Sequence, residues 1–237
     1  MKLITKILAL AIIATFLASI PMVLAENNKN ELVKVVSDIR VDTADGKPAG
    51  TPGARPSKDS GSYSLTGASW KTVPISIEVD PISASENSVF FSAIVAAVEE
   101  WDSHTDANLA NPVIMAQSQL YPDTDAPDYV NEIMFGDLSS TSIIAQTSYW
   151  YNRYTGEMVD FNIVFNTYFQ WGDANSDSAL MDIQNIATHE FGHGFGLADL
   201  YKPKLSALTM YGYASEGQID KRTLEAGDIA GIQAIYG

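Results

Sequence analysis

The stretch that decides the fold is His189-Glu190-Phe191-Gly192-His193-Gly194-Phe195-Gly196-Leu197-Ala198-Asp199. It contains two of the three histidines of the chain, four residues apart, with a glutamate directly after the first. Residues i and i+4 lie one above the other on the same face of a helix, so the two imidazoles can bind one metal ion. This spacing is typical of the H-E-x-x-H zinc site.

A catalytic zinc site normally has three protein ligands and an open position for water. Gly196 follows at the place where the helix has to end, because glycine readily adopts the left-handed conformation that closes a helix. Asp199 comes three residues later, and its carboxylate can reach the same metal. We therefore predict that His189, His193 and Asp199 bind zinc. The alternative for Asp199 is a capping or surface carboxylate.

The full pattern, H-E-x-x-H-x-x-G-x-x-D, resembles the metzincin clan of zinc peptidases, in which most members have a histidine at the place of Asp199 and a Met-turn follows. Snapalysin-type secreted peptidases are similar in having an aspartate there. Leu208-Thr209-Met210-Tyr211-Gly212 resembles the Met-turn of the matrixins, which implies that Met210 lies beneath the zinc. Residues 223–237 resemble the last helix of a matrixin catalytic domain.

Glu190 is expected to act as the general base rather than as a ligand, because its neighbours on the helix already point at the metal. The alternative is a charge on the helix surface. Met210 is equally compatible with plain core packing. Tyr211 and Tyr213 are candidates to line the substrate cleft.

The resemblance implies an α+β zincin fold with a mixed, twisted five-stranded sheet, a long first helix, an active-site helix and a C-terminal helix. Ser83-Ala84-Ser85-Glu86 reads as a capping box, which predicts one long helix that runs to about Ser103. The other two helices are predicted at residues 180–194 and from an N-cap at Thr223. Alternation of apolar and polar residues predicts the strands, at residues 73–79, 112–116, 131–136, 143–151 and 158–166.

By the same resemblance, residues 143–151 would be the antiparallel edge strand that pairs with an extended substrate. An ordinary strand of the sheet is the alternative.

Three segments are expected along the chain. Residues 1–25 have a basic start, an apolar run and a Val23-Leu24-Ala25 cleavage site, which is typical of a secretory signal peptide; an uncleaved membrane anchor is the alternative. Residues 26–62 are polar and are predicted to be a linker or short prosegment, in which residues 31–41 are a candidate for a short helix or strand. Residues 63–237 are predicted to form the matrixin-like catalytic domain.

Composition excludes several classes of function. The 237 residues contain no cysteine, which excludes disulfides, thiol catalysis and cysteine-bound zinc. The formal net charge of −15 argues against nucleic acid and anionic membranes as partners. Two acidic loops are candidates for calcium, at residues 173–177 and at Asp123, Asp125 and Asp128.

The sequence thus predicts a secreted, monomeric zinc endopeptidase that acts on proteins or peptides. A catalytically silent, secreted zinc-binding or surface protein with the same fold is the main alternative. A zinc enzyme that hydrolyses a non-peptide amide is compatible with the same motif.

Overall fold

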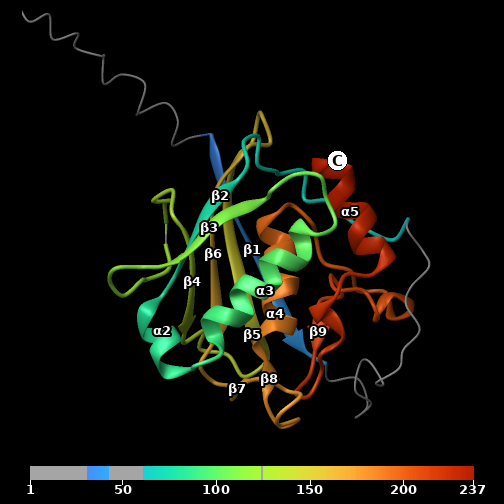
Figure 1. Cartoon of the computed structure of the whole chain (residues 1–237). Coiled ribbons are helices and arrows are strands. Elements are labelled where there is room, and N and C mark those ends of the chain that lie inside the picture. The colour runs from blue at the N-terminus through green and yellow to red at the C-terminus, as the bar shows by residue number, and fades with distance from the viewer. Residues whose placement is uncertain (1–30, 43–60, 124) are drawn as a thin grey trace, which may run out of the picture. The chain divides into compact units, whose positions relative to one another are not determined.

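The main sheet is mixed and contains seven strands, in the order β3-β2-β4-β6-β5-β1-β9. The computed structural model describes residues 31–42, 61–123 and 125–237 (Figure 1). β5 runs antiparallel to both of its neighbours, β6 and β1, while the other neighbouring strands are parallel. The strands are β1 Leu32–Val41, β2 Ile75–Val79, β3 Ala110–Met115, β4 Asn131–Gly136, β5 Ile143–Asn152, β6 Met158–Asn166 and β9 Tyr213–Ala214.

The five strands predicted from residue alternation are present, and the α+β architecture with a mixed sheet is confirmed. The predicted number of strands is wrong, because β1 and β9 extend the sheet beyond β5. β1 comes from the segment that was predicted to be a linker or short prosegment. Whether that segment is a prosegment stays a prediction, and the predicted signal peptide lies outside the described residues.

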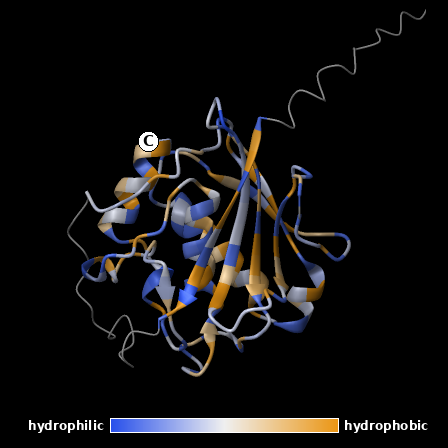
Figure 2. Ribbon diagram, turned by 180° about the vertical axis from the view of Figure 1, so that it is seen from behind, coloured by the Kyte–Doolittle hydropathy of each residue, from blue (hydrophilic) through white to orange (hydrophobic). Residues whose placement is uncertain are grey.

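Two helices, α3 and α4, lie against one face of the sheet (Figure 1). Figure 2 views the chain from behind, where the strands lie in front of these helices. Among the described residues, no helix has the length and apolar content required to cross a bilayer. The remaining elements are α2 Pro81–Glu86, α3 Phe90–Asp102, α4 Ile183–Gly194, α5 Ala226–Tyr236, two single 3-10 turns at Pro203–Leu205 and Asp220–Arg222, and a small parallel pair, β7 Trp171–Gly172 with β8 Met181–Asp182.

The first helix is divided in two, so the prediction of one long helix after a capping box at Ser83 is wrong. Asp80 is the N-cap of α2, and its carboxylate accepts hydrogen bonds from the Ser83 backbone N (2.7 Å) and hydroxyl (2.6 Å). Asn87 then ends α2 in an extended conformation. Its side chain bonds to the Trp171 carbonyl and the Val89 N–H, and these contacts replace the helical ones.

The C-terminal helix begins later than predicted. Its N-cap is Glu225 rather than Thr223, and a capping box with Asp228 fixes the first turn. Glutamate is an unusual N-cap, which is why the sequence pattern favoured the threonine. Ile232 of this helix is fully buried, while Ile229 and Tyr236 are half-buried.

The core between the sheet and the helices is rich in aromatic rings. Trp101 of α3 is fully buried and donates its indole N–H to the Thr188 carbonyl of α4 (2.8 Å). Phe191 and Phe195 of α4 stack on each other, and Phe161 of β6 packs edge-on against Phe191. These contacts fix the position of α4 against the sheet.

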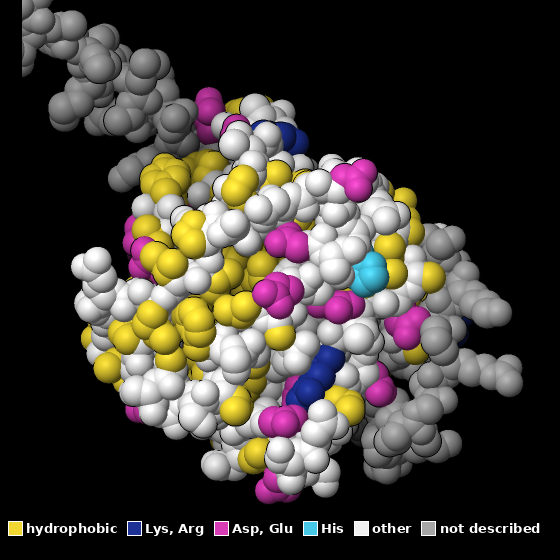
Figure 3. Space-filling view, in the orientation of Figure 1, with side chains coloured by type: hydrophobic (Ala, Val, Ile, Leu, Met, Phe, Trp, Pro, Cys, Tyr) yellow, Lys and Arg dark blue, Asp and Glu magenta, His cyan; other side chains and the backbone are white. Residues whose placement is uncertain are grey.

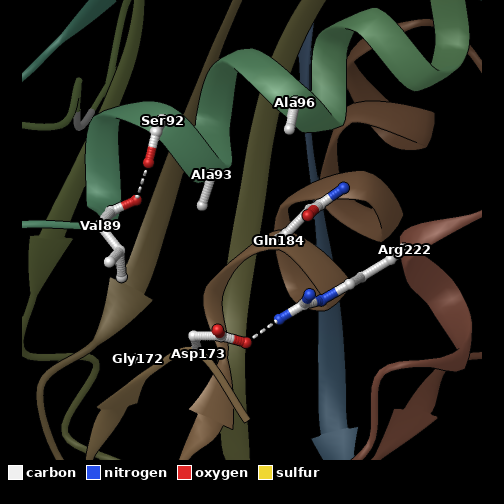
Figure 4. A pocket seen from close by; sticks show the side chains of 8 residues that line it. All are labelled: Val89, Ser92, Ala93, Ala96, Gly172, Asp173, Gln184 and Arg222. Carbon is white, nitrogen blue, oxygen red and sulfur yellow. Dashed lines mark hydrogen bonds and ion pairs between the residues drawn. The ribbon is translucent and has the colours of Figure 1, made fainter. Parts of the chain in front are cut away.

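The start of α4 is held by a buried carboxylate. Asp182 accepts hydrogen bonds from Asn185 N (2.8 Å) as the N-cap and from Ala174 N (2.8 Å). Arg222 donates Nε to the same carboxylate (2.8 Å) and also reaches Asp173. Figure 4 shows Arg222 and Asp173 beside Gln184 in a pocket of about 300 Å³. Asp173 Oδ1 is thus bound by an arginine, and calcium binding at residues 173–177 stays a prediction.

We predict that Asp182→Ala lowers the free energy of unfolding by about 2 kcal/mol, because a helix cap is lost and Arg222 loses a partner. Asp182→Asn keeps an acceptor at the cap and is the matched variant, with a smaller loss. Urea unfolding followed by circular dichroism measures both. Equal stability of Asp182→Ala and the parent would contradict this account of the helix start.

Candidate metal centre

The candidate site lies on the last two turns of α4, where the helix is buried on every side. His189, Glu190 and His193 each have 0% of their surface exposed. The helix ends as predicted at Gly196, whose φ of +105° only glycine adopts readily. A Cβ there would lie 2.4 Å from the Ala68 carbonyl oxygen, so the turn also has no room for a side chain.

The structure brings the three predicted ligands together. Asp199 Oδ1 lies 3.3 Å from His189 Nε2 and 3.4 Å from His193 Nε2. One ligand atom from each residue lies within 4.8 Å of the other two. All three of these atoms are buried, and among the described residues none has a hydrogen-bond partner. Two imidazole nitrogens and a carboxylate oxygen that converge without partners fit a zinc ion.

Each ligand is oriented by a contact on its other side. His189 Nδ1 lies 2.7 Å from the Thr209 carbonyl oxygen, and His193 Nδ1 lies 2.9 Å from the Leu197 carbonyl oxygen. A protonated Nδ1 that donates to a carbonyl leaves Nε2 free to bind a metal. Tyr201 donates its hydroxyl to Asp199 Oδ2 (3.0 Å), which leaves Oδ1 facing the histidines. Sequence reasoning did not identify Tyr201, because no motif covers it.

The charges at the site favour a cation. Burial alone would raise the pKa of Asp199, but the two imidazoles outweigh it and hold that pKa well below its ordinary value. Burial lowers the pKa of His189 to about 4, so this imidazole is neutral, the form that binds a metal. Burial would also lower the pKa of His193, but the carboxylates of Asp199 and Glu190 raise it to about 9. The carboxylates thus stabilise positive charge beside the imidazoles, and a divalent ion supplies such charge.

Glu190 has one oxygen held and one oxygen free of hydrogen bonds among the described residues. Thr147 of β5 donates its hydroxyl to Glu190 Oε2 (2.5 Å), while Oε1 is buried without a partner. Burial raises the pKa of Glu190 to about 7. A carboxylate with a pKa near neutrality is well matched to proton transfer at that pH. Sequence reasoning missed Thr147, since it lies on a distant strand.

The segment after the site passes under α4 at Met210. A Cβ added at Gly192 would lie 2.2 Å from Met210 Sδ, so the glycine in the motif makes room for the methionine. Asp228 of α5 accepts hydrogen bonds from Thr209 N (2.9 Å) and Met210 N (3.1 Å). Met210 thus packs against α4 at Gly192, and its place beneath the zinc stays a prediction.

A buried lysine holds the same segment from the other side. Lys221 is 1% exposed, and its Nζ donates to the carbonyls of Leu208 (3.1 Å), Thr209 (3.2 Å) and Tyr211 (2.7 Å). Thr209 O is also the partner of His189 Nδ1, so Lys221 helps to fix a ligand. No local pattern indicates this role, because a single lysine is usually exposed.

The two tyrosines proposed for the cleft occupy different places. Tyr211 is buried, with its ring 5.5 Å from Lys221 Nζ. Tyr213 is half-buried, belongs to β9 and packs edge-on against the ring of Tyr201. Their roles in a cleft stay predictions.

The remaining candidate groups lie elsewhere. His104 follows α3, and its Nε2 lies 3.2 Å from Glu100 Oε1. Asp123 and Asp128 form a second carboxylate cluster, with Asp160 of β6 in place of Asp125. Calcium binding there stays a prediction. Figure 3 shows Asp and Glu side chains spread over one face of the molecule with few Lys or Arg.

We predict that Gly192→Ala lowers the free energy of unfolding by about 1–3 kcal/mol, because the added methyl group meets Met210 Sδ. Met210→Ala should partly relieve that clash, so the two changes together should cost less than the sum of the two. Chemical denaturation of the four proteins measures the coupling. Gly194→Ala is the control, since its methyl group would contact the Phe161 ring instead. Strict additivity of Gly192→Ala and Met210→Ala would contradict the packing.

The stability of the protein should depend on pH because of two buried acids, Glu132 and Asp160, the second of which belongs to the second carboxylate cluster. Burial, together with the charges of Asp123 and Asp128, raises the pKa of both Glu132 and Asp160 to about 8. In the unfolded chain these acids titrate near pH 4, so the folded protein binds more protons between about pH 4 and 8, and its stability falls as the pH rises. We predict that the melting temperature, measured with a chelator present, falls between pH 5 and pH 8.

Asp160→Asn should reduce that slope, because it removes one of the two titrating groups. Asp125→Asn is the control, since Asp125 is exposed and lies outside the cluster. An unchanged slope in Asp160→Asn would contradict the assignment.

Comparison with known proteins agrees with this geometry. Residues 140–237 match the family model Peptidase_M10, described as Matrixin. The matched segment includes β5, β6, α4, Met210 and α5. No curated protein matches the chain. A matrixin domain suggests a metalloendopeptidase, and the cluster of His189, His193 and Asp199 is consistent with an aspartate as third ligand.

Proposed function

We propose that this protein is a zinc-dependent endopeptidase, in which His189, His193 and Asp199 hold the metal and Glu190 is the general base. The observation that carries the proposal is the convergence of three buried ligand atoms without partners beside a carboxylate with a free oxygen. The matrixin match over residues 140–237 supports the same activity.

The residues divide the chemistry between them. When bound, zinc supplies a Lewis acid that polarises the peptide carbonyl and makes water more acidic. Glu190 takes a proton from the attacking water at its free Oε1 and gives it to the nitrogen of the departing amine. Thr147 holds the other oxygen, so the carboxylate keeps one orientation through both transfers. Asp199 places a negative charge beside the metal, which should make the water slightly less acidic than three neutral histidines would.

The proposal also includes the substrates, the location and the oligomeric state of the enzyme. A peptidase family implies protein substrates. The signal-like residues 1–25 support secretion, and we propose an extracellular enzyme that acts as a monomer.

The test is cleavage of casein by the zinc-loaded protein and by Glu190→Gln, with zinc content measured in each. Loss of a general base should lower the rate by about 100-fold or more while zinc stays bound. Glu157→Gln is the control, because Glu157 is exposed on a turn. His193→Ala should lose the metal as well as the activity.

Two results would count against the proposal. Cleavage by Glu190→Gln at the parent rate would remove Glu190 from the mechanism. One zinc bound per chain, with no peptide bond cut in casein or in the chain itself, would favour a silent zinc-binding protein.

A further inference from the structure

The strand β1 covers the edge of the sheet at which a substrate was expected to pair. It runs antiparallel to β5 along nearly its whole length, from Leu32 opposite Asn152 to Arg40 opposite Ile143. The prediction that β5 is an edge strand is therefore wrong, because β5 lies between β6 and β1 in the sheet. A peptide that adds to the edge of a sheet makes the same main-chain bonds, so β1 occupies the position of an added strand.

The end of β1 is held on both sides. Val41 N donates to the Ser142 carbonyl oxygen, next to β5, at 2.9 Å. On the other side, Arg40 N donates to Gly212 O (3.1 Å) and Asp42 N donates to Ala214 O (2.9 Å). Residues 40–42 thus lie in a slot, antiparallel to β5 and parallel to β9. The contacts named here are made by backbone groups, which an extended peptide of the same direction also offers.

Two anchor points locate the segment relative to the candidate metal centre. Ser37 lies opposite Thr147, whose hydroxyl binds Glu190. Arg40 bonds to Gly212, and a Cβ at Gly212 would lie 3.0 Å from Asp199 Oδ1. The chain from Ser37 to Arg40 therefore runs from the general base to a metal ligand, and its middle peptide bond joins Asp38 to Ile39.

Asp38 is held next to the residue that binds the base. Its carboxylate accepts a hydrogen bond from Gln146 Nε2 of β5 (2.8 Å). Gln146 directly precedes Thr147, whose hydroxyl binds Glu190, so Asp38 lies beside this part of the site.

The side chains of the segment differ sharply in burial. Ile39 is 0% exposed and belongs to the hydrophobic core, and it is the one fully buried residue of β1. Asp38 and Arg40 point the other way, and the Arg40 side chain is 54% exposed. An extended peptide in this position thus inserts a single side chain, the one directly after the middle bond.

We propose that residues 37–42 lie in the substrate cleft of this protein as a peptide substrate does, with the bond between Asp38 and Ile39 as the bond that is hydrolysed. The proposal rests on the endopeptidase function proposed above. Water adds its oxygen to the Asp38 carbonyl carbon, the C–N bond breaks, and the Ile39 nitrogen leaves as an amine with a proton from that water. The cleft accordingly selects substrates with an aliphatic side chain directly after the scissile bond.

Residues 37–42 compete with other substrates for the cleft, because they belong to the same chain. A segment attached in this way has an effective concentration of about 1 mM, so other substrates are largely excluded while it is bound. Displacement of the segment should therefore raise the cleavage of casein by about tenfold or more.

The first experiment follows the chain itself. The full chain is incubated with zinc, and its fragments are identified by intact mass and N-terminal sequencing. We expect a new N-terminus at Ile39 in the parent and none in Glu190→Gln. A cut at other bonds only, in a chain that cleaves casein, would overturn the assignment of the scissile bond and leave the proposed function intact.

The second experiment does not depend on catalysis. Binding of a fluorescent peptide with the sequence of residues 34–42 is measured in EDTA by anisotropy. Ile39→Asp places a charge in the buried pocket and should release the segment, so the peptide binds this variant but not the parent. Val36→Asp is the matched control, because Val36 is 47% exposed on the outer face of the same strand. It should behave as the parent.

Arg40→Pro provides a second way to release the segment, since it removes the N–H donor to Gly212 without changing the core. The test therefore does not depend on whether Ile39→Asp folds. Circular dichroism and melting temperature confirm which variants are folded. Peptide binding to the released variants without any cleavage would support the occupied cleft and reject the hydrolysis. Equal peptide binding and equal casein cleavage by the parent and a folded, released variant would overturn the occupied cleft.

Discussion

Burial of α4 on every side is the constraint on which the rest of the structure depends. A buried polar group without a partner is costly, so each polar side chain on this helix has to be satisfied within the protein. The imidazoles of His189 and His193 find backbone carbonyls at Nδ1, and Glu190 finds the Thr147 hydroxyl. Among the described residues, three side-chain atoms of this helix without a partner belong to the candidate metal centre, namely His189 Nε2, His193 Nε2 and Glu190 Oε1. Asn185 Nδ2 is the fourth such atom of the helix.

The same constraint reaches the segment beneath the helix. The Thr209 carbonyl serves both His189 and Lys221, while the N–H groups of Thr209 and Met210 are satisfied by Asp228. Lys221 and Asp228 are both almost fully buried, so neither charge has water to stabilise it. They are held by backbone groups of one turn, and that turn in consequence has little freedom to move. His189 bonds to this turn through the Thr209 carbonyl, so its imidazole is oriented before any metal binds.

Local sequence signals were sufficient wherever the cause was local. The spacing of His189, Glu190 and His193 predicted the helix and the ligand pair, and Gly196 predicted where the helix ends. Alternation located the central strands, with β4 and β6 matching residue for residue. Asp199 was identified because it lies within the same short motif.

The errors concern contacts between residues far apart in the chain. Asn87 divides the first helix because it bonds to Trp171, and no local pattern shows that partner. The pairing of β1 with β5 was not predicted, because β5 begins a hundred residues later in the chain. Thr147, Tyr201 and Lys221 belong to no motif, and only the fold brings them to the site.

The position of the bonds that hold β1 has a kinetic consequence. The hydrogen bonds to Ser142, Gly212 and Ala214 all come from residues after Ile39, and the buried side chain of Ile39 lies on the same side of the proposed cut. A cut before Ile39 breaks none of them, and the new amine end stays joined to the rest of the chain through Asp42. Directly after the cut, the cleft of the enzyme would still hold the product segment that begins at Ile39. Its first turnover on another substrate would wait for that product to dissociate, which predicts a lag that no dilution of the enzyme can shorten.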